Sequence, residues 1–213
     1  MAQARNVSLL VNSQNLNEEQ QMIQEMAYKF ASEELEPHAA KWDKEKIFPI
    51  DTYKAAAELG FGGIYVSEDN GGCGLTRVEA SLVFEALSTG CVGSSAYLSI
   101  HNMCGWMIDA FGTKEQQEKY LPDMMSMDCL SSYCLTEPDS GSDAQAMKST
   151  AMDKGDHFVL NGSKAFISGS GTEGQIYLVM CKTGENEVSC LILESGMPGL
   201  SFGANEHKMG WNV

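Results

Sequence analysis

Apolar residues recur every three or four positions along the first half of the chain, a spacing that predicts amphipathic helices. The first helix follows Asn17, which can cap a helix and which Gln20 can answer in a capping box. We expect Pro37 to close this helix. Further helices are predicted over residues 51–59, 76–87 and 94–111, and another after Thr113, where Gln116 completes a second capping box.

The hydrophobic period changes after Cys129, where short β-prone runs replace the helical spacing. Three such runs lie at residues 157–160, 176–181 and 188–193. Asp153-Lys154-Gly155-Asp156 and Asn161-Gly162 are turn signals, and we expect hairpins at both. The two patterns predict an α+β fold class, with an all-α domain over residues 15–128 and a β domain over residues 129–213.

Residues 1–14 contain one basic residue, Arg5, and no acidic residue, which is typical of a leader or the remnant of an organelle presequence. A disordered leader or a cloning remnant explains this composition equally well. The sequence contains no run of about eighteen apolar residues, so we predict no membrane span.

The 29 acidic and 14 basic side chains give the 213-residue chain a formal charge of -15. This charge argues against nucleic acid or an anionic membrane as a partner, because phosphate contacts need local positive charge. The seven cysteines include no Cys-x-x-Cys pair, which disfavours a disulfide framework and favours a reducing compartment. His101 and Cys104 have a metal-like spacing, but a buried helix is the preferred interpretation, and we assign no metal.

Six blocks of sequence stand out by their order and spacing. They are Leu59–Ile64, Gly71–Leu75, Gly112–Pro122, Tyr133–Asp143, Leu160–Ser168 and Gly203–Trp211. Over residues 16–213 these blocks resemble the acyl-CoA dehydrogenase family. The resemblance implies that the β domain is the family's β-barrel-like middle domain. It also implies that the family's C-terminal four-helix bundle is missing from this sequence.

The resemblance implies that the first wall of an FAD site is formed by Tyr133, Leu135 and Thr136, with Thr136 bonding the edge of the flavin ring. Gly141 lets the backbone approach a ligand closely. Ser142 would touch both FAD and the acyl-CoA substrate. Without this context the loop is an ordinary turn, and Tyr133 is a packed aromatic residue.

The second wall implied by the resemblance is formed by Phe166, Ile167 and Ser168. Phe166 stands where the family commonly has tryptophan, so an aromatic face is kept while the indole N–H is lost. Ser168 replaces the usual threonine and keeps the hydroxyl. From these three residues alone, a plain core strand would be the preferred interpretation.

The implied reaction is the α,β-dehydrogenation of an acyl-CoA, in which a glutamate removes the α-proton and the β-hydrogen leaves as hydride to the flavin. Within the family, three segments are most similar to the valine-pathway branch, which acts on isobutyryl-CoA: Phe61–Val66, Ala96–Cys104 and Ser163–Gly169. The resemblance implies that the catalytic glutamate belongs to the C-terminal bundle, beyond Val213, so we nominate no catalytic residue in this sequence. Glu137 is interpreted as a structural residue, a turn or surface carboxylate.

The resemblance also implies electron-transferring flavoprotein as the acceptor, the mitochondrial matrix as the location and a homotetramer for a full-length chain. The alternative is a truncated, non-catalytic isoform or fragment that acts only as a binding or interaction module. An oxygen-reactive relative such as an acyl-CoA oxidase fits the loop spacing less well.

Overall fold

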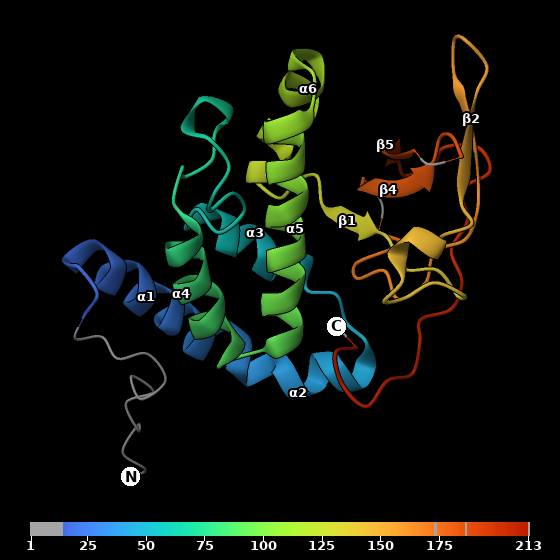
Figure 1. The fold of residues 1–213 in the computed structure, drawn as a ribbon. Coiled ribbons are helices and arrows are strands. Elements are labelled where there is room, and N and C mark those ends of the chain that lie inside the picture. Colours follow the sequence, from blue (N-terminus) through green and yellow to red (C-terminus); the bar gives the residue numbers. More distant parts are fainter. Residues whose placement is uncertain (1–14, 173, 186, 213) are drawn as a thin grey trace.

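The computed structural model describes residues 15–212 except 173 and 186, so the predicted leader over residues 1–14 lies outside the described residues. Helices form the first part of the chain and strands the second (Figure 1). The helices are α1 (Glu18–Phe30), α2 (Glu36–Glu45), α3 (Ile50–Glu58), α4 (Arg77–Ser88), α5 (Val92–Phe111) and α6 (Lys114–Met125). The strands are β1 (Ser131–Cys134), β2 (Thr150–Asp153), β3 (Phe158–Asn161), β4 (Ile176–Lys182) and β5 (Val188–Glu194). This order confirms the α+β fold class.

Capping boxes begin three of the helices. Asn17 caps α1 and accepts the backbone N–H of Gln20 at 2.8 Å, and the Gln20 side chain bonds back to the cap. Thr113 and Gln116 repeat this arrangement at α6. Both predicted helix starts are confirmed, because a capping box satisfies free N–H groups with residues only three positions apart.

The prediction that Pro37 closes the first helix is wrong. A π-helical segment, Ala31–Leu35, joins α1 to α2, and Pro37 lies in the first turn of α2. Proline is tolerated there because the N–H groups of a first turn need no intrahelical partner.

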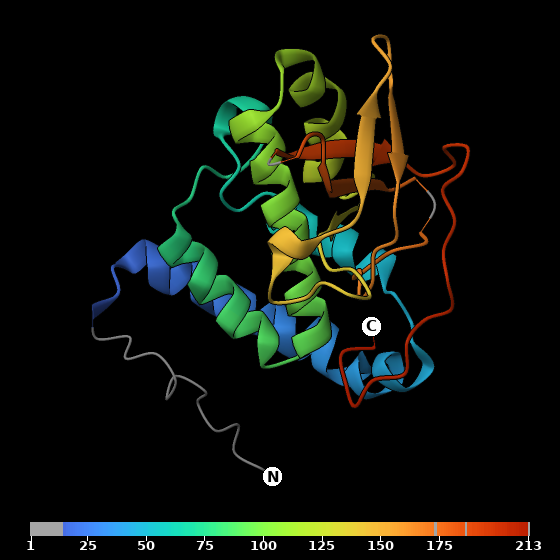
Figure 2. The ribbon, with the colours of Figure 1, turned by 45° about the vertical axis from the view of Figure 1, so that its right-hand side comes forward.

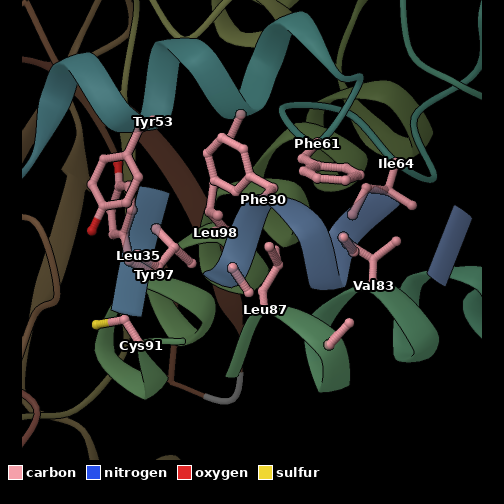
Figure 3. Packing of buried hydrophobic residues seen from close by; sticks show 14 of the residues in the cluster. Phe30, Leu35, Tyr53, Phe61, Ile64, Val83, Leu87, Cys91, Tyr97 and Leu98 are labelled. Atoms are coloured by element: carbon pink, nitrogen blue, oxygen red, sulfur yellow. The ribbon is translucent and has the colours of Figure 1, made fainter. Parts of the chain in front are cut away.

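A cluster of buried hydrophobic residues, several of them aromatic, forms the core of the helical part (Figure 3). The rings of Phe30 and Phe61 meet edge to face with their centroids 6.2 Å apart. Tyr53 and Tyr97 lie beside each other with centroids 4.9 Å apart. Tyr97 belongs to α5, the long buried helix that also packs against the sheet through Ile108, so α5 joins the two parts of the molecule.

β4 lies at the centre of a mixed sheet. It pairs in parallel with β1 along Ser131–Cys134, antiparallel with β5 along its whole length, and with β2 at its last residue, Lys182. The predicted runs at 176–181 and 188–193 are therefore confirmed as paired strands. β2 and β3 form a hairpin that extends away from the other strands (Figure 2).

The two predicted hairpins have different outcomes. The turn at residues 154–157 joins β2 to β3, which confirms the first. The second is wrong, because Asn161 ends β3 and the strand that follows, β4, does not pair with β3. Gly162 instead allows close packing, since an added Cβ there would lie 2.5 Å from the Cβ of Ser149.

Candidate functional site

The strand that leads into the candidate site presents its side chains to two different surroundings, because successive strand residues point to opposite faces. Tyr133 packs against the cluster of the helical part that includes Cys104 and Ile108. Cys134 packs on the other side with Tyr177. β1 is thus enclosed on both faces before the chain leaves the sheet.

A tight turn follows the half-buried residues Leu135 and Thr136. The backbone N–H of Glu137 donates to the carbonyl of Ser140 at 2.9 Å, and the N–H of Ser140 donates back at 3.1 Å. The Ser140 hydroxyl donates to the carbonyl of Asp143 at 2.7 Å. These bonds stabilise the turn on both sides of Gly141 and Ser142, the predicted ligand contacts.

Gly141 and Ser142 lie exposed within this turn. A Cβ added at Gly141 would meet no atom within 4 Å. The protein itself therefore places no steric demand for glycine at this position, and the space beside it is open to a ligand.

The structure brings the second predicted wall directly beside the first. The backbone N–H of Ala165 donates to the carbonyl of Thr136 at 2.8 Å. The hydroxyl of Ser132 donates to the carbonyl of Ser168 at 2.6 Å. Two segments that lie some thirty positions apart in the sequence are therefore fastened together at both ends of the second wall.

The three residues of the second wall are oriented differently. Ile167 packs inward beside Cys134 and Tyr177, whereas Ser168 is half-buried. Phe166 is 69% exposed and has a φ of 58°, the left-handed region that bulky residues seldom occupy. Backbone conformations of this rare kind cluster at functional sites, so Phe166 is a candidate contact for a ligand.

A buried ion pair holds both walls in place. Nζ of Lys164 lies 2.8 Å from Oε1 of Glu137 and also donates to the carbonyl of Leu135 at 3.0 Å. Only 10% of the lysine side chain and 4% of the glutamate side chain are exposed. The Glu137 carboxylate also accepts the N–H groups of Lys148, at 2.6 Å, and Ser149, at 3.0 Å.

The surroundings of Glu137 determine its charge. Burial alone would raise the pKa of this carboxyl, but the hydrogen bonds from Lys164, Ser149 and Lys148 outweigh burial and lower the pKa to about 2. Glu137 is therefore ionised at neutral pH, with both oxygens occupied. The prediction of a turn residue is right, whereas that of a surface carboxylate is wrong, because Lys164 and two amides replace the water that it loses.

Sequence reasoning missed Lys164, although the residue lies inside a predicted block. One signal could have indicated its role. Lys164 is a charged residue just before the apolar residues of the second wall. Its partner lies 27 positions away, so the pairing itself is not visible along the chain.

His101, whose spacing to Cys104 resembled a metal site, is fully buried on α5. Both ring nitrogens have partners within the protein, the carbonyl of Met124 and the hydroxyl of Ser131. Over the described residues no group of three or more His, Cys, Asp or Glu side chains could hold a metal ion. None of the helices described here is both long and apolar enough to cross a membrane.

The arrangement fits a planar, partly polar ligand. Phe166 offers an exposed aromatic face, and Gly141 leaves open space for a ligand to approach. Thr136 and Ser168 carry hydroxyls at the two fastened walls, and Ser142 carries one on the exposed turn. These features suit an isoalloxazine ring, which needs a flat contact surface and polar groups at its edge.

Comparison with known proteins establishes the family. The acyl-CoA dehydrogenase N-terminal domain matches residues 17–128, and the acyl-CoA dehydrogenase middle domain matches residues 132–213. The chain belongs to the acyl-CoA dehydrogenase family of oxidoreductases.

Within this family, the chain is similar to two isobutyryl-CoA dehydrogenases and to a solved FAD complex. The mitochondrial isobutyryl-CoA dehydrogenase of Bos taurus is 53% identical over 209 residues, which cover 97% of this chain and 50% of the relative. That of Dictyostelium discoideum is 54% identical over 205 residues, which cover 94% of this chain and 49% of the relative. A solved acyl-CoA dehydrogenase complexed with FAD, from Bacillus anthracis, has a TM-score of 0.84 at 32% identity and covers 93% of this chain and 34% of that chain. The chain spans about half the length of the curated relatives it matches.

Proposed function

We propose that this chain forms the flavin-binding part of an FAD-dependent acyl-CoA dehydrogenase that acts on a short branched acyl-CoA, isobutyryl-CoA. The observation that carries the proposal is the joining of the two predicted walls through Thr136 and Ala165, with the buried pair of Glu137 and Lys164 behind them. The identity to two isobutyryl-CoA dehydrogenases supports the choice of substrate.

The side chains of this chain would bind and orient the reactants. Bound FAD would supply the acceptor for the hydride that leaves the β-carbon of the acyl group. Thr136 would donate to the edge of the ring, Phe166 would cover its face, and Ser142 would contact both the cofactor and the acyl-CoA. The first wall would continue along Tyr133 and Leu135, and the second along Ile167 and Ser168.

Glu137 is unsuited to removing the α-proton. Its carboxylate oxygens already accept hydrogen bonds from Lys164 and two backbone amides, and its pKa of about 2 makes it a weak base. We therefore propose that the base is the glutamate of the family's C-terminal bundle and not Glu137.

We also propose an electron acceptor, a cellular location and an oligomeric state. The electrons would pass to electron-transferring flavoprotein, the acceptor used in the family. The mitochondrial relatives support a mitochondrial location, and we propose the matrix. A full-length protein would form a homotetramer, as the family resemblance implies.

The test is a titration of the 213-residue chain with FAD, followed by flavin absorbance and fluorescence. Saturable binding with a shifted flavin spectrum supports the proposal, and absence of binding contradicts it and favours a non-catalytic module. Isobutyryl-CoA and octanoyl-CoA are then added to the FAD complex without oxygen. A larger spectral change with isobutyryl-CoA supports the branched substrate, whereas bleaching of the flavin would show that this chain supplies a base after all.

A further inference from the structure

We propose that Ser131 and Ser132, neighbours on β1, are positioning residues of the flavin site. Ser131 fixes the first wall to the helical part, and Ser132 fixes the second wall to the first. The inference rests on the proposed function for the identity of the ligand. The arrangement of the two serines is a property of the chain itself.

Ser131 connects β1 to helix α5. Its hydroxyl lies 3.0 Å from Nδ1 of His101, and its carbonyl accepts the hydroxyl of Tyr97 at 3.2 Å. Nε2 of His101 lies 2.9 Å from the carbonyl of Met124. A carbonyl only accepts, so Nε2 carries the proton and Nδ1 accepts the hydrogen of Ser131. Tyr97 and His101 are one helical turn apart, so one face of α5 holds the start of the first wall.

Ser132 connects β1 to the second wall. Its hydroxyl donates to the carbonyl of Ser168 at 2.6 Å and accepts Nε2–H of Gln175, also at 2.6 Å. Oε1 of Gln175 in turn accepts the hydroxyl of Tyr177 at 3.1 Å, and the Tyr177 oxygen accepts the N–H of Gly171 at 3.2 Å. Every donor in this series has one acceptor. The hydroxyl hydrogen of Ser132 is therefore directed at the second wall.

Ser131 and Ser132 are adjacent in a strand, so their side chains point to opposite faces of β1. Both Ser131 and Ser132 are 0% exposed because β1 runs between the helical part and the segment that carries Ser168. Burying a hydroxyl is unfavourable unless it is hydrogen-bonded, and both hydroxyls are bonded to partners on opposite sides. The pair fixes β1 relative to both neighbours, which hydrophobic packing alone does less specifically.

The test compares Ser132→Ala with Ser95→Ala. Ser95 is also a buried serine, 4% exposed, and its hydroxyl donates to the carbonyl of Phe84 at 2.8 Å, within the helical part. Each variant removes one buried hydroxyl with a backbone acceptor, but only Ser132 reaches the second wall. Amide hydrogen exchange over residues 165–171 and the dissociation constant for FAD are measured for both variants and the unmodified chain.

We expect Ser132→Ala to speed exchange over residues 165–171 about tenfold and to raise the dissociation constant for FAD about tenfold. Ser95→Ala should leave both within about twofold. If Ser132→Ala also stays within twofold on both measurements, the positioning role is wrong. Equal changes in the two variants would also overturn it, because they would report general loosening.

A second variant covers the case in which Ser132→Ala does not fold. Gln175→Met keeps the Ser132 hydroxyl and removes the donor that orients it. A smaller acceleration of exchange over residues 165–171 is expected, and unchanged exchange there would overturn the inference. If the unmodified chain binds no FAD, the proposed function fails on this chain. The exchange comparison still decides whether Ser132 holds the second wall.

Discussion

Replacing Glu137 with glutamine tests whether the buried ion pair holds the candidate site together. Glu137→Gln keeps the shape of the side chain and removes its charge. Lys164 then remains 10% exposed without a carboxylate, and the backbone N–H groups of Lys148 and Ser149 lose a charged acceptor. Removing one partner from a buried ion pair costs about 3–5 kcal/mol, because the remaining charge is left uncompensated.

The pKa of Glu137 gives a second measure of the same effect. Its fall from 4.5 to about 2 corresponds to about 3 kcal/mol of folding free energy. Because the pKa is lower in the folded state, this contribution is complete above pH 4.5 and is lost as the pH falls through about 2. We therefore expect Glu137→Gln to lower the free energy of unfolding by about 3 kcal/mol at pH 7 and by only about 1 kcal/mol at pH 3.

Urea denaturation of the 213-residue chain, followed by tryptophan fluorescence at pH 7 and pH 3, measures these differences. Asp139→Asn is the matched control. Asp139 belongs to the same turn, and its Oδ2 lies 2.7 Å from Nζ of Lys148. The side chains of Asp139 and Lys148 are 68% and 72% exposed, respectively. Solvent weakens such a pair, so the control should lose less than about 1 kcal/mol.

At pH 7, a loss of unfolding free energy below about 1 kcal/mol for Glu137→Gln would refute the reasoning. A loss at pH 7 no larger than that of Asp139→Asn would refute it as well. The double variant Glu137→Gln/Lys164→Met adds a check on the cause. It removes both charges, so it should be more stable than Glu137→Gln alone. If the double variant is less stable, the unpaired lysine is not the source of the loss.

Two further predictions concern packing and pH. Gly162→Ala should destabilise the chain by about 1–3 kcal/mol in a thermal melt, because the new Cβ would lie 2.8 Å from Cα of Ser149. Gly141→Ala, which meets no atom within 4 Å, should stay within about 0.5 kcal/mol, and equal effects of the two variants would contradict this prediction. Burial lowers the pKa of His101 from 6.5 to about 4, so the unfolded chain binds a proton that the folded chain resists. The free energy of unfolding, measured in urea titrations, should therefore fall by about 2 kcal/mol as the pH falls from 6.5 to 4.5. A His101→Asn variant whose free energy of unfolding falls just as steeply would disprove this role of His101.

Local signals predicted the fold where a few neighbouring residues determine the structure. Asn17 with Gln20 and Thr113 with Gln116 lie within one helical turn, so the capping boxes were visible in the sequence. Pro37 misled because the same residue suits the first turn of a new helix as well as the end of an old one.

The candidate site was predicted unevenly for a similar reason. The two wall segments, residues 133–136 and 166–168, were predicted from ordered sequence blocks, and the structure places these segments side by side. Lys164 and Ser132 were missed because their partners lie 27 and 36 positions away. A pairing of that kind depends on how the sheet and the connecting segments fold, and the neighbouring residues carry no sign of it.

The parallel pairing of β1 with β4 has a consequence for synthesis of the chain on the ribosome. Ser131 pairs with Ile176, 45 positions later (131 to 176), since parallel strands need a long connection between them. A nascent chain that has emerged to residue 170 therefore carries both walls without the strand that supports β1. Contacts this distant form late, and unpaired strands are open to chaperones and proteases until they do. A flavin site that depends on this pairing would be complete only after Val179, the last β4 residue paired with β1, has left the ribosome.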